Sequence, residues 1–141
     1  MTRKILTFYL EGQMFGIDIR LVKEINRKIR YTEIPGAPDF IVGLFNMRGQ
    51  VVTVLDLASR IQGEKGTIAQ HPTCIILKNH NDEGEYMGFV VDRTGDVLDI
   101  EDDWCEPLPG NIKNIDGKYI KEVVKLEAQL IMIVDPDKIF S

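Results

Sequence analysis

Residues 50–56 read Gln-Val-Val-Thr-Val-Leu-Asp, and residues 129–135 repeat this pattern as Gln-Leu-Ile-Met-Ile-Val-Asp, 79 positions later. A second match relates residues 16–25 to residues 88–97 at an offset of 72. Strand-like segments match one another by chance rather often, so either match alone is weak. Because the two matches occur in the same order, each offset by about half the chain, they predict two related β subdomains.

Alternation of apolar and polar residues extends outward from this repeat, so the chain is predicted to be mainly β with short helices. Leu6, Phe8 and Leu10 share one strand face, and a turn at 11–13 leads to a second strand, which together make a hairpin. Further strands are predicted over 50–57, 73–78, 86–92, 97–100, 119–126 and 130–135. A turn over 79–85 would make a second hairpin.

Two short helices are predicted between these strands. Asp18 can cap the first, and Pro38 suits the first position of the second. The apolar stripe of the first helix would be Leu21, Val22, Ile25 and Ile29, and that of the second would be Phe40, Ile41, Leu44 and Phe45. Residues 58–72 are polar and are expected to form an exposed connection, and residues 104–117 a long loop.

Composition indicates an ordinary globular protein, with 141 residues, 44% apolar and 28% charged. Each half alone is small for a stable core, so residues 1–141 are predicted to form one cooperative domain. The net charge of −5 argues against general binding of nucleic acid or anionic membranes. The apolar run at residues 5–10 is too short for a signal peptide or a membrane span, which favours the cytoplasm.

Catalytic and metal-binding patterns are not found in the sequence. His71 and His80 fall in predicted loops, and neither has a cysteine or carboxylate at metal-ligand spacing. Cys74 lies in an apolar run, where a cysteine behaves as a small buried hydrophobe. Asp56 and Asp135 end equivalent strands of the repeat, where capping or turn formation explains them. No enzyme activity, cofactor or metal is therefore predicted.

Recognition by a surface is the remaining hypothesis. Val22 and Glu24 lie on the first predicted helix or at its exit, and residues 46–49, Asn-Met-Arg-Gly, form a turn before an apolar strand. From the residues alone, core packing is the favoured explanation of Val22, and an ordinary surface arginine explains Arg48. The residues alone do not decide between these interpretations.

A resemblance to a known protein family favours recognition by a surface. Residues 15–25 and the segment 34–57, which joins Ile-Pro-Gly-Ala-Pro to Asn-Met-Arg-Gly-Gln, are similar to the opening and the hallmark segment of the CheW-like domain family. Residues 87–92 and 130–135 resemble its later strands. The similarity runs in order from Leu6 to Phe140. One departure is Glu122, which stands where glycine is common in the family and predicts a different local turn.

The resemblance implies two SH3-like five-stranded β-barrel subdomains packed side by side. It also implies a non-catalytic adaptor without a cofactor, a monomer in isolation, that links the cytoplasmic tip of methyl-accepting chemoreceptors to the regulatory domain of the chemotaxis histidine kinase. Such a protein is recruited to membrane-associated chemoreceptor arrays. The implied partner-contacting or surface-shaping residues are Val22, Glu24, Gly43, Arg48, Gly49 and Val51.

Two alternatives remain. One is a CheW-like adaptor of another chemosensory array, such as one that controls surface motility. The other is a small β-barrel enzyme or ligand carrier, which would require paired catalytic groups in a cleft.

Overall fold

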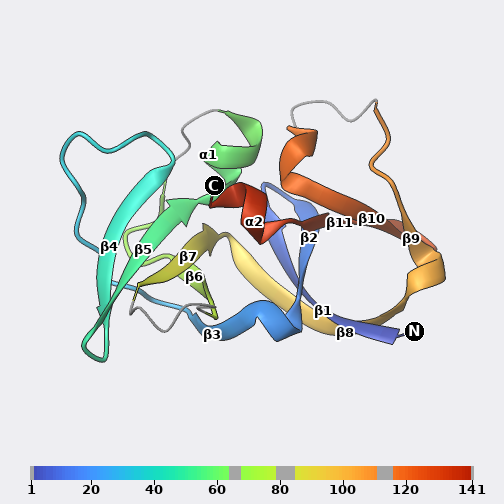
Figure 1. Cartoon of the computed structure of the whole chain (residues 1–141), viewed down its shortest axis with the longest axis horizontal. Helices are drawn as coiled ribbons and strands as arrows, with labels where there is room; N and C mark the ends of the chain where they lie inside the picture. The colour runs from blue at the N-terminus through green and yellow to red at the C-terminus, as the bar shows by residue number, and fades with distance from the viewer. Residues whose placement is uncertain (1, 64–67, 79–84, 111–115, 141) are drawn as a thin grey trace.

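Two β-sheet subdomains lie side by side in the computed structural model, which describes residues 2–63, 68–78, 85–110 and 116–140 (Figure 1). Subdomain A has the strand order β8-β1-β2-β11-β10-β9, and subdomain B has the order β3-β6-β7-β5-β4. The strands of A are β1 (Thr2–Leu10), β2 (Gln13–Asp18), β8 (Arg93–Glu101), β9 (Cys105–Glu106), β10 (Ile120–Leu126) and β11 (Gln129–Val134). The strands of B are β3 (Val22–Asn26), β4 (Ile41–Met47), β5 (Gln50–Asp56), β6 (Thr73–Leu77) and β7 (Tyr86–Val91). The predicted fold of two packed β subdomains is confirmed, with the short β9 as a sixth strand in A.

The internal repeat has a direct structural counterpart. β2 and β11 are parallel neighbours in subdomain A, and their repeat equivalents β7 and β5 are parallel neighbours in subdomain B. Each pair occupies the third and fourth places of its sheet. The sequence match therefore identified the centre of both sheets.

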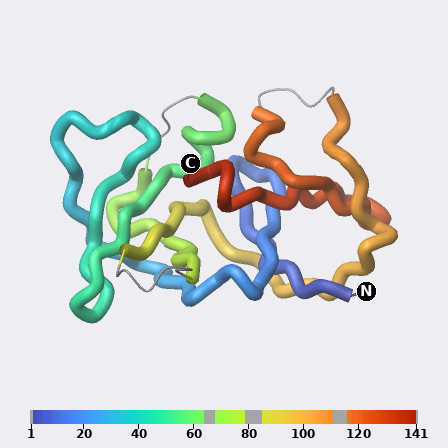
Figure 2. The backbone as a smooth tube through the Cα atoms, in the orientation of Figure 1, coloured from blue at the N-terminus to red at the C-terminus, as the bar shows by residue number. Residues whose placement is uncertain are grey.

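The chain crosses between the subdomains twice, as the backbone trace shows (Figure 2). β2 leads through the 3-10 turn η1 (Ile19–Leu21) into β3 of subdomain B, and β7 leads through Asp92 into β8 of subdomain A. Each sequence half therefore contributes strands to both sheets.

The largest apolar cluster joins the two subdomains. Phe8 and Phe15 of A and Phe89 of B are completely buried in it, with the Phe8 ring centroid 5.9 Å from Phe15 and 5.4 Å from Phe89. Smaller clusters fill each subdomain separately. Because apolar burial stabilises roughly in proportion to area, this central cluster stabilises both sheets at once.

Both predicted helices are wrong. Residues 18–29 form only η1 followed by β3, although Asp18 does cap η1 by accepting a hydrogen bond from the Arg20 amide at 2.9 Å. The segment from Pro38 makes a turn and then β4, which pairs along its length with β5. Short apolar runs do not distinguish a strand from a buried helix, and the available partner strands decide the outcome.

Helices occur instead at the two strand ends related by the repeat. α1 (Leu57–Gln62) lies in the segment predicted as an exposed connection and buries Leu57 and Ile61. α2 (Pro136–Ile139) follows β11. Asp56 and Asp135 cap them, accepting amide hydrogen bonds from Ser59 at 3.4 Å and Asp137 at 3.1 Å, so their predicted capping role is confirmed.

The remaining connections are only partly described. Two further 3-10 turns, η2 (Asp102–Trp104) and η3 (Gly117–Tyr119), lie at the two ends of the segment 104–117 predicted as a long loop. β6 and β7 pair antiparallel, as the predicted second hairpin requires. Most of its turn, residues 79–84 with His80, lies outside the described residues, as do 64–67 and 111–115.

Candidate functional site

The turn between β4 and β5 presents an arginine in an unusual backbone conformation. Met47 pairs with Gln50, which leaves a two-residue loop of Arg48 and Gly49 with φ values of 53° and 88°. Positive φ at both positions is the feature of a type I′ turn and is costly for a non-glycine residue. The Asn46 side chain fixes the turn by accepting a hydrogen bond from the Gly49 amide at 2.7 Å.

Arg48 forms an ion pair across the open side of sheet B. Its guanidinium donates to both carboxylate oxygens of Glu24, at 2.5 and 3.4 Å. Glu24 lies on β3 and Arg48 follows β4, the two opposite edges of this sheet, so the pair joins the edges where the sheet curls on itself. The hydrogen bond from Arg48 lowers the pKa of Glu24 below its ordinary value.

This pair lies at the surface, because the Arg48 side chain is 71% exposed and the Glu24 side chain 29%. Val51, two residues after Gly49, is 50% exposed. The ion pair therefore brings Glu24 to the Arg48–Gly49 turn, and Val51 follows this turn on β5; we call these four residues the hairpin surface. It combines an exposed apolar side chain with a guanidinium whose direction Glu24 fixes, which suits charge-assisted, directional bonding.

Gly43 and Val22, the other two predicted residues, have supporting positions. Gly43 lies at a bulge in β4, and a Cβ atom there would collide with the carbonyl of Thr32. The Thr32 amide donates to the Leu44 carbonyl at 2.7 Å, so Gly43 allows the chain after β3 to close against β4. Val22 is half-buried, pairs with Leu77 and packs on the central cluster, as the core-packing interpretation expects.

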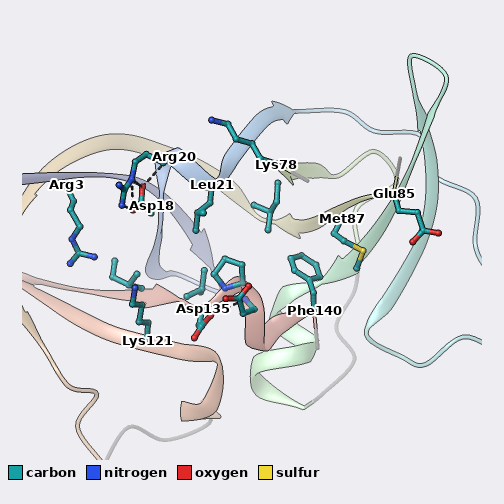
Figure 3. Close-up of a pocket in the computed structure, with 15 residues that line it drawn as sticks. Arg3, Asp18, Arg20, Leu21, Lys78, Glu85, Met87, Lys121, Asp135 and Phe140 are labelled. Carbon is teal, nitrogen blue, oxygen red and sulfur yellow. Dashed lines mark hydrogen bonds and ion pairs between the residues drawn. The ribbon is translucent and has the colours of Figure 1, made fainter. Parts of the chain in front are cut away.

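A groove between the two subdomains is a second candidate site, and the sequence did not indicate it (Figure 3). Its volume is about 610 Å³. Its apolar residues are Leu21, Leu77, Met87, Ile133, Val134, Pro136 and Phe140. Its charged residues have both signs and are Arg3, Asp18, Arg20, Lys78, Glu85, Lys121, Asp135 and Asp137. Arg3 and Lys121 lie toward one end of the close-up, and Met87 and Glu85 lie toward the other.

The groove could not be predicted from the sequence because its residues belong to no contiguous motif. They come from β1, the β2–β3 crossover, the β6–β7 region and the segment from β10 to α2. The only available signal was the repeat itself, since two related subdomains in one chain imply a seam between them.

The cysteines and the possible metal ligands indicate no further candidate site within the described residues. Cys74 is completely buried, as predicted, and burial raises the pKa of its thiol to about 12. Cys74 and Cys105 are both free thiols. Within the described ranges, His, Cys, Asp and Glu form no group of three that could hold a metal ion, and no helix there is long and apolar enough to cross a membrane.

Comparison with known proteins gives the family. Residues 4–141 match the model of the CheW-like domain. The chain belongs to the CheW-like domain family. It is 28% identical to the chemotaxis protein CheW of Bacillus subtilis, over 98% of this chain and 86% of that protein. It is 30% identical to the chemotaxis protein CheW of Klebsiella aerogenes, over 99% of this chain and 82% of that protein.

A solved structure agrees with the CheW-like assignment. The scaffolding protein TtCheW from Thermoanaerobacter tengcongensis superimposes with a TM-score of 0.84 at 30% identity, covering 100% of this chain and 89% of that one. These matches confirm the predicted family, the fold and the role of a chemotaxis adaptor, and they do not favour the adaptor of another chemosensory array.

Proposed function

We propose that this CheW-like chain is a non-catalytic scaffold that couples the cytoplasmic tip of chemoreceptors to the regulatory domain of the chemotaxis histidine kinase. The observation that carries the proposal is the presence of two distinct recognition surfaces, the groove and the hairpin surface, on one small protein. A coupling protein needs separate surfaces, because it must hold both partners at the same time. The chain would be a monomer alone and would join receptor arrays at the membrane through these contacts.

The groove is assigned to the receptor. A receptor tip is a helical hairpin, and a helix docks into an apolar groove through side chains spaced along one face. Leu21 and Phe140 supply apolar contacts, and charged residues of both signs surround them. Val22 follows Leu21 directly and would position this part of the groove from the core side.

The hairpin surface is assigned to the kinase regulatory domain. A folded domain presents a broad surface, which suits an exposed apolar residue beside a fixed guanidinium better than a groove does. Val51 would supply the apolar contact and Arg48 the directional hydrogen bonds. Glu24, Gly43 and Gly49 would hold the two in place.

Two variants with matched controls test this division of labour. Leu21→Ala should weaken binding of a receptor cytoplasmic fragment about tenfold, a loss typical of one apolar anchor, while kinase-domain binding is retained. Val51→Ser should show the opposite pattern. Leu130→Ser is the control for Val51, since Leu130 is its exposed repeat equivalent on subdomain A. Loss of both partners in either variant, at unchanged thermal stability, would contradict separate surfaces.

A further inference from the structure

Asp56 is a buried carboxylic acid at the end of β5. Only 5% of the residue is exposed. Its amide donates to the Phe40 carbonyl at 2.8 Å, and its side chain caps α1 through the Ser59 amide. The backbone amide thus ties Asp56 to the segment before β4, and the carboxyl group holds the start of α1, so turning the carboxyl group to solvent would break this cap.

A cavity of about 330 Å³ beside Asp56 is lined by other acids. Glu11 comes from the β1–β2 turn, and Asp92 comes from the crossover between β7 and β8. These two are coupled, because the Asp92 carboxylate accepts a hydrogen bond from the Glu11 amide at 2.7 Å. Asp56, Glu11 and Asp92 therefore line one cavity where the chain passes from one subdomain to the other.

Basic side chains do not offset this concentration of acids in the described part of the chain. A second cavity, of about 580 Å³, is also lined by Asp56 and contributes Glu33 and Asp39. His71 is the one described residue in either lining that can become cationic.

The nearest arginines in sequence are engaged elsewhere. Arg60 of α1 donates to the Ile139 carbonyl at 3.2 Å, and Arg93 lies over the Tyr9 ring at 3.7 Å.

Asp135 is the natural comparison. It occupies the equivalent place in the repeat and caps α2. It lines the groove together with Arg3, Arg20 and Lys121, so cationic groups share its surroundings. The same capping residue is therefore in an acidic cavity in one subdomain and in a groove of mixed charge in the other.

We propose that Asp56 is a proton-linked latch at the junction of the two subdomains. When the Asp56 carboxyl takes up a proton, its repulsion with Asp92 and Glu11 ends, and the β1–β2 turn, the crossover and the start of α1 pack more firmly. Burial chiefly, with the charges of Asp92 and Glu11 adding to it, raises the pKa of Asp56 above its ordinary value. A pKa raised by folding contributes stability below the unfolded-state value and loses it as the pH rises through the folded-state value.

Thermal unfolding of the full chain tests the latch. Asn caps a helix about as well as Asp, so Asp56→Asn keeps the cap and removes the charge. Across a series from about pH 4 to about pH 8, the melting temperature of Asp56→Asn should rise relative to the unsubstituted chain by about 2–4 °C. For Asp135→Asn, the matched control, the difference in melting temperature from the unsubstituted chain should not grow with pH. A difference in melting temperature for Asp56→Asn that stays constant with pH would overturn the proposal.

A direct titration keeps the proposal falsifiable if Asp56→Asn folds poorly. Carboxyl-carbon NMR of the unsubstituted chain should give a midpoint for Asp56 above the ordinary aspartate value. Amide hydrogen exchange at residues 11–12 and 57–60, corrected for intrinsic rates, should slow as Asp56 becomes protonated. An Asp56 midpoint at or below the ordinary value would overturn the latch.

Discussion

Among the described residues, subdomains A and B each show one arginine–glutamate pair that joins parts of the sheet that are not neighbours, but the two pairs differ in burial. In A, Arg3 of β1 and Glu122 of β10 lie 2.7 Å apart, and both side chains are only 21% exposed. The Arg3 guanidinium also lies 3.0 Å from Asp102 and donates to the Cys105 sulfur at 2.8 Å. In B, the Arg48 guanidinium donates hydrogen bonds to Glu24, its partner among the described residues, and the Arg48 side chain is 71% exposed.

We propose that this difference separates a stabilising contact from a recognition contact. A largely buried guanidinium that donates to both Cys105 and Glu122 loses both hydrogen bonds when it is replaced, whereas exposed ion pairs contribute little to stability. Arg3 would therefore stabilise subdomain A, while Arg48 would remain available to a partner. Glu122, the departure from the family pattern, lies at a bulge in β10 and supplies the acid in A.

The largest expected effect comes from dividing the chain. A fragment of residues 1–66 includes Glu24 and Arg48 but lacks Glu122, β6, β7 and the rest of sheet A. Because the crossovers place strands of each half in both sheets, the fragment should be unfolded or aggregated, and the full chain should melt in one transition. Circular dichroism and calorimetry measure both. A separate, sharp melting transition of the fragment would contradict the shared core.

Removing the pair in subdomain A should have the next largest effect. Arg3→Met keeps the length of the side chain but removes the ion pair with Glu122 and the hydrogen bond to Cys105, which should cost about 1–3 kcal/mol in the free energy of unfolding. Lys4→Met is a control on the same strand, since the Lys4–Asp99 pair is largely exposed. Equal losses in the free energy of unfolding for the two variants, measured in urea, would show that the Arg3–Glu122 pair stabilises the protein no more than an exposed pair does.

Substitutions of Arg48 should change stability little but coupling strongly. Arg48→Asn suits the left-handed turn position, because Asn-Gly is favoured in type I′ loops, so its melting temperature should equal or exceed that of the unsubstituted chain. Arg48→Ala tests the side chain without that advantage. Both should impair receptor-controlled kinase activation, and Arg48→Lys should restore it in part. A marked fall in melting temperature for Arg48→Asn would instead make Arg48 a structural brace like Arg3.

The smallest effect concerns the acid limb of the pH profile. Arg48 lowers the pKa of Glu24, so the contribution of this pair is present above the unfolded value and is lost as the pH falls through the lowered folded value. In Arg48→Asn, the carboxyl-carbon NMR midpoint of Glu24 should move to higher pH, and salt should reduce the difference. An unchanged midpoint would mean that the pair does not persist in solution.

Sequence reasoning was sound where residue type alone determines structure. Period-two alternation and the repeat gave the two β subdomains, and the capping roles of Asp56 and Asp135 needed only local geometry. It failed at residues 18–29 and 38–45, where apolar spacing fitted a helix but β6 and β5 were available as pairing partners. It also missed α1, whose buried Leu57 and Ile61 are separated by Ala58, Ser59 and Arg60, in a segment predicted as an exposed connection.

The two candidate surfaces also differ in how far the sequence could predict them. The hairpin surface could be anticipated because Arg48 and Gly49 are adjacent in a recognisable motif. The groove could not, because it depends on residues as distant as Arg3 and Phe140 that meet only after the chain has crossed between the sheets. Glu24 lies between these cases, since its pairing with Arg48 follows from the curl of sheet B.

Reconstitution of kinase control tests the central claim most directly. Receptor cytoplasmic fragments, the histidine kinase and this chain are combined, and kinase autophosphorylation is measured with and without each component. The account predicts that receptor-dependent control of the kinase requires this chain, that the chain binds both partners at once, and that Leu21→Ala and Arg48→Asn each impair control while remaining folded. Receptor control that is the same with and without this chain would contradict it.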